Sequence, residues 1–192
     1  MKIVKENKVD VKELVTALKN GAVLILPTDT VYGLVCDSTN EKAVEKIFEI
    51  KKRDKSKTLP VFVNGIKMAE EYAVIDGTQR EFLGKNWPGA VTVVLHGKKG
   101  LSPLVYKDGT IALRQSNYKL VIDIMELLGK PMAQTSANIS GWPALIKISE
   151  IIKTFSETAI QPDIIIDAGD LPKNTSSKIV DLSKGKEEVL RY

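Results

Sequence analysis

A short, uninterrupted apolar run constrains the fold of this chain more than any other feature. Residues 22–26 read AVLIL and lie between Gly21 and Pro27. A surface helix needs regularly spaced polar positions, and a strand with one solvent-exposed face alternates polar and apolar residues. A short run with neither pattern is typical of a strand covered on both faces. Covering layers on both sides favour an α/β sheet flanked by helices.

The rest of the chain supplies the helices and further strands. Asp10 and Glu13 have the spacing of a capping box, Asn40 and Asn117 are expected helix caps, and Gly129 is an expected stop. Helical periodicity predicts helices over 11–18, 43–50, 66–72, 78–83, 120–128 and 148–155. Apolar runs predict strands over 22–26, 59–63, 90–95, 110–114, 131–136, 163–167 and 178–182.

These elements alternate only in part. Roughly seven strands and roughly five or six helices, without an internal repeat or a linker, predict one α/β domain over residues 1–192. Because strict alternation is missing, we expect a twisted, open mixed sheet flanked by helices rather than a doubly wound one.

Composition excludes several classes of site. The single cysteine, Cys36, rules out an internal disulfide, and with the single histidine, His96, it leaves too few soft ligands for zinc. We expect Cys36 in the core and His96 at an exposed strand end, and we expect no protein-bound metal. No apolar run is long enough to span a bilayer and the N-terminus is charged, so a cytoplasmic location without membrane contact is expected.

Four polar loops adjoin predicted strands, and a basic segment lies among them. The loops are 27–30 (PTDT), 114–117 (RQSN), 135–141 (TSANISG) and 173–178 (KNTSSK), and the segment is 51–57 (KKRDKSK). Each loop alone is explained by turn formation, and the segment alone by a solvated helix end. Together they suit a polyanion such as a nucleoside triphosphate. Neither a P-loop nor a Rossmann glycine motif occurs, so a triphosphate must be held in another way.

The ordered motifs resemble the YrdC-type family, the threonylcarbamoyl-AMP synthases, in a single-domain form. They are PTDTVYGL (27–34), KKR with Lys57 and Leu59, WPGAVT (87–92), IALR (111–114), TSANISGWPA (135–144), and SSKIVD with the closing LR (176–191). The resemblance implies a twisted sheet with a concave substrate face. It also implies synthesis of threonylcarbamoyl-AMP and pyrophosphate from L-threonine, bicarbonate or CO₂, and ATP, with Mg²⁺ as the expected companion of ATP. The product would serve tRNA modification through separate transferase proteins.

The resemblance also implies a role for individual residues. Thr30, Arg114 and Ser177 would surround the threonine, with Arg114 gripping its carboxylate, whereas Thr28 and Asp29 would shape the turn. Tyr32 either packs beneath the pocket or lines it. The catalytic cations would be Lys51 and Arg53, and the ATP-binding residues would be Arg53, Lys57, Thr110, Ser136, Asn138 and Arg191.

The chain departs from the family pattern at several positions. Asp54 and Thr58 stand where prolines are usual, Ser116 where a proline is frequent, and Lys178 where threonine is common. Asp54 would compete for Arg53 as an ion-pair partner. Phe62 replaces a histidine that some relatives carry near the threonine, so the contact there would be apolar.

The alternative is a module that binds double-stranded RNA or tRNA without catalysis. Its support is a net charge of +4, a pI near 9.0 and the basic segment. Aromatic residues make up only 6% of the chain and form no stacking motif. The charge therefore predicts at most weak binding of tRNA or other RNA, in addition to the enzymatic function.

Overall fold

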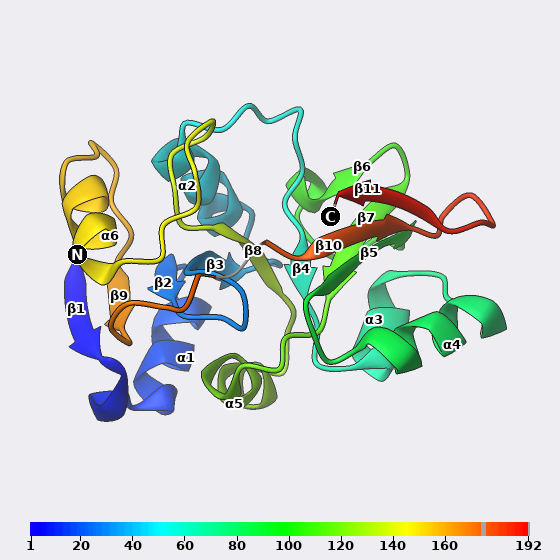
Figure 1. The fold of residues 1–192 in the computed structure, drawn as a ribbon, viewed down its shortest axis with the longest axis horizontal. Helices are drawn as coiled ribbons and strands as arrows, with labels where there is room; N and C mark the ends of the chain where they lie inside the picture. The colour runs from blue at the N-terminus through cyan, green and yellow to red at the C-terminus, as the bar shows by residue number, and fades with distance from the viewer. Residues whose placement is uncertain (174–175, 192) are drawn as a thin grey trace.

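The apolar runs form the strands of one continuous sheet (Figure 1). The structure, a computed structural model, describes residues 1–173 and 176–191. Within these residues the sheet has eleven strands. They are β1 (Lys2–Lys5), β2 (Leu24–Leu26), β3 (Gly33–Asp37), β4 (Val61–Phe62), β5 (Val91–His96), β6 (Tyr106–Lys107), β7 (Thr110–Arg114), β8 (Met132–Ser136), β9 (Ile164–Asp167), β10 (Lys178–Asp181) and β11 (Glu188–Arg191).

The sheet is mixed, as predicted. Its order is β1-β9-β2-β3-β8-β4-β7-β5-β10-β11, with β6 paired to β7. The pairs β1–β9, β2–β9, β4–β7 and β5–β10 are parallel, and the neighbours of β3 and β8 are antiparallel. The predicted strand number was too low, because β1, β3, β6 and β11 were missed.

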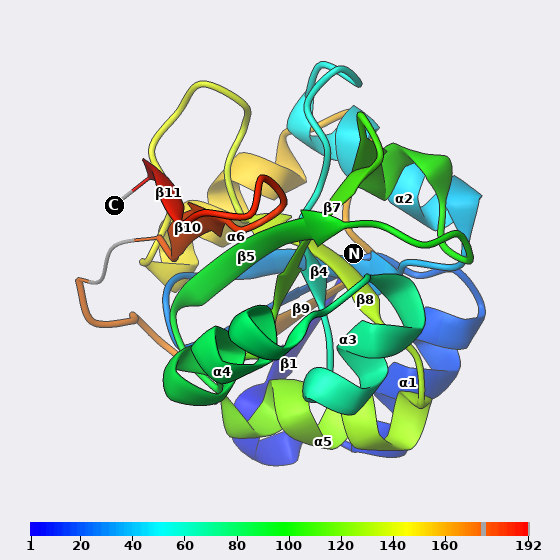
Figure 2. The ribbon, with the colours of Figure 1, turned by 90° about the vertical axis from the view of Figure 1, so that its right-hand side faces the viewer.

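Helices cover both faces of this sheet. In Figure 1, α2 and α6 lie on one side of the strands, and α1, α3, α4 and α5 lie on the other. In Figure 2, α3, α4 and α5 lie below β5 and β7. The helices are α1 (Val11–Lys19), α2 (Glu41–Lys51), α3 (Ile66–Tyr72), α4 (Gly77–Asn86), α5 (Lys119–Leu128) and α6 (Ile148–Ser156), with 3₁₀ turns at Glu6–Lys8 and Pro103–Val105.

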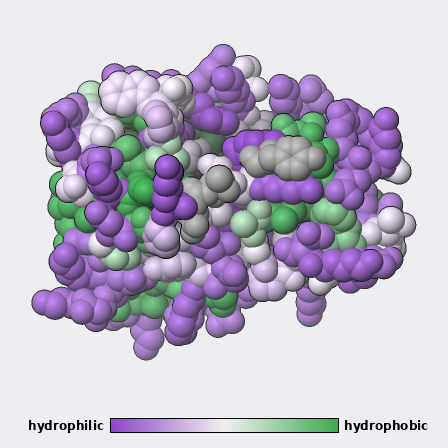
Figure 3. Space-filling model, viewed as in Figure 1, coloured by the Kyte–Doolittle hydropathy of each residue, from purple (hydrophilic) through white to green (hydrophobic). Residues whose placement is uncertain are grey.

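The apolar run at residues 22–26 is buried on both faces. Leu24 and Leu26 pack into a core that includes α1 and α5, while Ile25 packs into the core beneath α2 and α6. Alternate side chains of a strand point to opposite faces, so one apolar run joins both cores. Outside, hydrophilic residues cover most of the face seen in Figure 3, with apolar patches between them.

Two expected helix caps differ in detail. Asp10 accepts a hydrogen bond from the backbone N–H of Lys12 at 2.8 Å, so it caps α1 without forming a capping box with Glu13. Helix α5 begins after Tyr118 rather than Asn117. Asn40 caps α2 through the N–H of Ala43 at 3.1 Å, as predicted.

The two soft side chains occupy the expected places. Cys36 is fully buried in β3, and burial raises the pKa of its thiol. His96 ends β5 and is exposed. Among the described residues, no helix is long and apolar enough to cross a membrane.

Candidate functional site

A cavity of about 560 Å³ lies across the sheet where the polar loops meet. Its floor includes Val94, Ala112, Gln134 and Ile179, which belong to β5, β7, β8 and β10. Polar side chains surround this partly apolar floor, and most of them were predicted. The predicted residues that line the cavity are Thr30, Arg53, Lys57, Arg114, Ser136, Ser177 and Arg191.

The turn before β3 is shaped by the hydroxyl of Thr28. It accepts a hydrogen bond from the N–H of Thr30 at 3.1 Å and donates to the carbonyl of Val31 at 2.7 Å. This local bonding is typical of a threonine in a turn, and it leaves the Thr30 side chain at the cavity. Beneath it Tyr32 is fully buried, and its hydroxyl donates to the carbonyl of Gly169 at 2.7 Å. Tyr32 therefore packs under the site.

Arg114 is fixed from several directions. Its Nη2 donates to Asp29 Oδ2 at 2.6 Å, its Nη1 to Thr30 Oγ1 at 3.2 Å and its Nε to the carbonyl of Gly89 at 3.1 Å. The guanidinium carbon also lies 5.7 Å from the centre of the Phe62 ring. The role expected for Asp29 was incomplete, because its carboxylate reaches across to β7 rather than serving the turn alone.

Burial shapes the electrostatics of this pair. The side chains of Arg114 and Asp29 are 3% and 9% exposed. Burial lowers the pKa of Arg114, and the carboxylate of Asp29 opposes that lowering. A guanidinium stays charged under such conditions, so a fixed positive group lies at the cavity wall.

The C-terminal strands close another side of the cavity. Ser177 shares a hydrogen bond with Thr92, with 2.8 Å between the hydroxyl oxygens. Arg191 in β11 donates from Nε and Nη2 to the carbonyl of Ser177 at 3.1 and 2.7 Å. Burial lowers the pKa of Arg191, and the positive charge of Arg114 adds to that effect. Within the predicted 173–178 loop, residues 174 and 175 lie outside the described part of the chain.

Within the basic segment, Arg53 lies beside the cavity and Lys51 does not. Arg53 donates from Nε to the carbonyl of Lys57 at 3.1 Å and from Nη2 to that of Thr58 at 2.9 Å, which holds it beside the cavity. Asp54 accepts a hydrogen bond from the N–H of Ser56 at 2.8 Å. The expected ion pair between Asp54 and Arg53 was wrong, since none is formed within the described residues.

Lys51 differs from its expected orientation. It is 1% exposed, and its ammonium donates to the carbonyls of Ser136 and Asn138 at 2.5 and 2.8 Å and to Asn138 Oδ1 at 2.9 Å. Burial, and secondarily the charge of Arg53, lowers the pKa of Lys51 to about 7. In this structure Lys51 does not face the cavity. It ties the C-terminal end of α2 to the loop that follows β8.

Asn138 and Thr110 also lie outside the cavity lining. The side-chain oxygen of Asn138 accepts from Ser136 Oγ at 2.6 Å, and its amide donates to the carbonyl of Trp142 at 2.6 Å. Thr110 donates to the carbonyl of Lys107 at 2.8 Å within the β6–β7 hairpin. Asn138 therefore organises the loop, and Thr110 closes a turn.

Sequence reasoning assigned no site role to five polar residues of the lining, which are Thr58, Lys107, Gln134, Thr135 and Ser176. Lys107 reaches the cavity from the β6–β7 hairpin, and Gln134 reaches it from the middle of β8. The sequence held a signal for Lys107, because the dipeptide that follows it, Asp108-Gly109, is typical of a β-hairpin turn. Both residues of the dipeptide have positive φ values, 50° and 75°. Gln134 had a weaker signal, as a polar residue inside an otherwise apolar strand.

The described residues offer no cluster of three or more His, Cys, Asp or Glu side chains that would hold a metal ion. Five cationic side chains line the cavity, and they are Arg53, Lys57, Lys107, Arg114 and Arg191. Such a set suits a ligand that carries phosphates and a carboxylate. Hydroxyl groups and strand-end backbone supply the remaining polar contacts.

Comparison with known proteins identifies relatives of this chain. The chain is 34% identical over 152 residues, 77% of its length, to the threonylcarbamoyl-AMP synthase of Photobacterium profundum, of which it covers 82%. It is 33% identical over 190 residues, 97% of its length, to a putative threonylcarbamoyl-AMP synthase of Methanocaldococcus jannaschii, of which it covers 88%.

A solved structure has the same fold. Pyrococcus abyssi Sua5 complexed with L-threonine superposes with a TM-score of 0.87 at 27% identity, over 99% of this chain. The chain spans 56% of that protein. The family profile Sua5_yciO_yrdC, described as "Telomere recombination", matches residues 16–192. This chain therefore belongs to the Sua5/YciO/YrdC family.

Proposed function

We propose that this chain is a threonylcarbamoyl-AMP synthase, which makes threonylcarbamoyl-AMP and pyrophosphate from L-threonine, bicarbonate or CO₂, and ATP. The observation that carries the proposal is one cavity that holds both the fixed guanidinium of Arg114 and a separate cation pair, Arg53 and Lys57. The first suits the carboxylate of an amino acid, and the pair suits a triphosphate. The relatives with this name support the assignment.

In this proposal Arg114, Thr30 and Ser177 bind threonine. Arg53, Lys57, Ser136 and Arg191 bind ATP, while Lys51 and Asn138 act by holding the end of β8, where Ser136 lies. Thr110 acts through the hairpin that presents Lys107. Mg²⁺ would enter with ATP and bind mainly phosphate oxygens and water, as this ion commonly does.

The proposed reaction has two steps. The threonine amine first forms a bond to the carbon of CO₂ and loses a proton, which gives a carbamate. When bicarbonate is the donor, the bond from its carbon to the hydroxyl oxygen also breaks, and that hydroxyl leaves with the amine proton as water. A carbamate oxygen then forms a bond to the α-phosphorus of ATP as the bond to the β-phosphate oxygen breaks, and pyrophosphate leaves with the electron pair. Positioning and charge neutralisation are the main demands of such a transfer. The product would pass to separate transferase proteins that modify tRNA in the cytoplasm.

The reaction is tested by pyrophosphate release. Purified protein should release pyrophosphate from ATP when both threonine and bicarbonate are present, and little when either is omitted. Pyrophosphate release that is unchanged when threonine and bicarbonate are omitted would contradict the synthase assignment.

Salt dependence addresses the RNA-binding alternative. A chain whose main role is RNA binding would bind duplex RNA with an affinity that falls steeply as salt rises, because phosphate contacts release counterions. Threonine-dependent turnover in a small-molecule cavity should depend much less on salt. Tight, salt-sensitive RNA binding without turnover would favour the alternative.

A further inference from the structure

Asp29 is nearly buried and uses both carboxylate oxygens. Oδ2 accepts from Arg114 Nη2 at 2.6 Å, and Oδ1 accepts from the hydroxyl of Ser116. Asp29 itself does not line the cavity, whereas Arg114 does. The carboxylate therefore contacts the guanidinium without belonging to the cavity lining.

Arg114 keeps part of its donor capacity for a ligand. Its contacts to Asp29, Thr30 and Gly89 use one N–H on each of its three nitrogens. A guanidinium has more N–H groups than these contacts require. The remaining donors belong to Nη1 and Nη2, the two nitrogens that bind a carboxylate side by side.

Ser116 fixes the direction of Asp29. Its oxygen accepts a hydrogen bond from the N–H of Tyr118 at 3.2 Å, so its own hydrogen is directed to Asp29. The start of α5 thereby connects through Ser116 and Asp29 to Arg114. Phe62 packs against the guanidinium at 5.7 Å, which limits its movement further.

We propose that Asp29 is a positioning residue, which holds Arg114 in the orientation that binds the substrate carboxylate, and that Ser116 supports it. This inference rests on the proposed function, because it takes the threonine carboxylate as the ligand. A fixed guanidinium binds with less loss of side-chain entropy than one that must be ordered on binding. Loss of Asp29 should therefore weaken threonine binding more than ATP binding.

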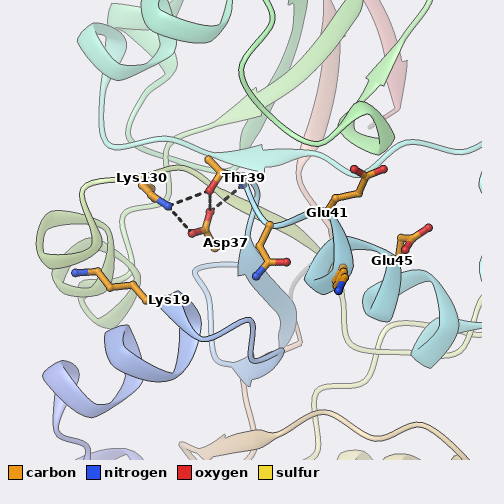
Figure 4. A pocket seen from close by; sticks show the side chains of 8 residues that line it. Lys19, Asp37, Thr39, Glu41, Glu45 and Lys130 are labelled. Atoms are coloured by element: carbon orange, nitrogen blue, oxygen red, sulfur yellow. Dashed lines mark hydrogen bonds and ion pairs between the residues drawn. The ribbon is translucent and has the colours of Figure 1, made fainter.

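The chain offers a matched control at Asp37. This carboxylate is 3% exposed, ion-pairs with Lys130 at 3.0 Å and accepts two hydrogen bonds from Thr39 (Figure 4). It ends β3, where it pairs with Met132, whereas Gly33 at the start of the strand pairs with Ser136 of the cavity lining. Asp37→Asn thus disturbs a similar buried carboxylate away from the cavity.

The experiment measures the Kd of L-threonine and of ATP by calorimetry for the whole chain and its variants. Asp29→Asn should raise the threonine Kd about tenfold and the ATP Kd by less than about twofold, with partial recovery in Asp29→Glu. Asp37→Asn should change neither by more than about twofold. Equal effects of Asp29→Asn and Asp37→Asn on threonine would overturn the inference.

A second variant keeps the test decisive if Asp29→Asn fails to fold. Ser116→Ala keeps both charges and removes one hydrogen bond, and it should raise the threonine Kd about threefold. An unchanged Kd in Ser116→Ala would then overturn the inference. Threonine binding without pyrophosphate release would contradict the proposed reaction, while the Kd values would still decide the role of Asp29.

Discussion

Two buried carboxylates near β3 bind cations in different ways. Asp29 pairs with Arg114 beside the cavity at 2.6 Å, and Asp37 pairs with Lys130 in a shallow surface hollow at 3.0 Å. The hollow is lined by Lys19, Asp37, Thr39, Asn40, Glu41, Lys42, Glu45 and Lys130. Figure 4 shows the second pair, with Thr39 on the same carboxylate. Arg114 is 3% exposed, whereas Lys130 is 45% exposed.

The two pairs differ in the exposure of their cations. Lys130 keeps much of its hydration, so its pair with Asp37 loses less hydration on the cation side than the Arg114–Asp29 pair does. Arg114 loses nearly all of its hydration and needs several fixed partners to offset that loss. We expect such burial where the remaining N–H donors of the guanidinium bind a ligand. The comparison predicts that variants at the cavity change activity and that variants at the hollow do not.

The largest effect is expected for Arg53→Ala. This substitution removes a cation beside the proposed triphosphate, so kcat/KM for ATP should fall about 100-fold or more, as measured by pyrophosphate release. Lys130→Ala, which removes a cation from the hollow, is the control and should keep its turnover. An unchanged rate in Arg53→Ala would indicate that the basic segment is only a solvated helix end.

A conservative exchange should separate the two pairs next. Arg114→Lys keeps the charge but loses the planar fork, so the threonine KM should rise about tenfold. The reverse exchange, Lys130→Arg, should leave the KM unchanged because the hollow binds no substrate in this account. Equal KM values in the two variants would contradict the functional distinction between the pairs.

Lys51 should give the wild-type protein a pH-dependent stability. Its folded pKa of about 7 lies below its ordinary value of 10.5. Between these pH values the unfolded chain binds more protons than the folded one, so the free energy of unfolding gains a positive slope with pH from this residue. Below pH 7 both states hold the proton and this contribution to the slope vanishes.

Urea unfolding of wild type and Lys51→Met across pH 6 to about 10 measures that slope. The variant should lack the rise that Lys51 contributes. Lys130→Met serves as control, because its larger exposure gives no comparable burial. Parallel curves for wild type and Lys51→Met would show that the Lys51 ammonium is not destabilised by burial.

The smallest effect on activity is expected for Lys130→Met. The Asp37 carboxylate keeps its hydrogen bonds to Thr39, so the free energy of unfolding should fall by about 1–2 kcal/mol. Turnover and both substrate KM values should stay within about twofold of wild type. A selective loss of ATP or threonine binding would give the hollow a function that this account does not contain.

The sequence predicted most, but not all, of the buried strands. Residues 22–26 were recognised as a covered strand because both neighbouring layers demand apolar side chains there. Strands β1 and β11 were missed because they are short and largely exposed, so little periodicity marks them. Strand β3 was missed because it follows a polar turn directly.

The site was predictable only as a set of motifs. Arg114 and Thr30 were assigned to one pocket through resemblance, and the structure brings them into contact. The partner of Arg114 was not predictable, because Asp29 lies 85 positions away and short-range patterns explain it as a turn residue. The burial of Lys51 likewise depends on how α2 meets the loop after β8, which no local pattern records.

Labelled bicarbonate tests the central claim most directly. The protein is incubated with ATP, L-threonine and ¹³C-bicarbonate, and the nucleotide products are analysed by mass spectrometry. The account predicts threonylcarbamoyl-AMP that carries the ¹³C label, with release of one pyrophosphate for each molecule formed. Formation of ADP or AMP alone, or of an adenylate without the label, would contradict it.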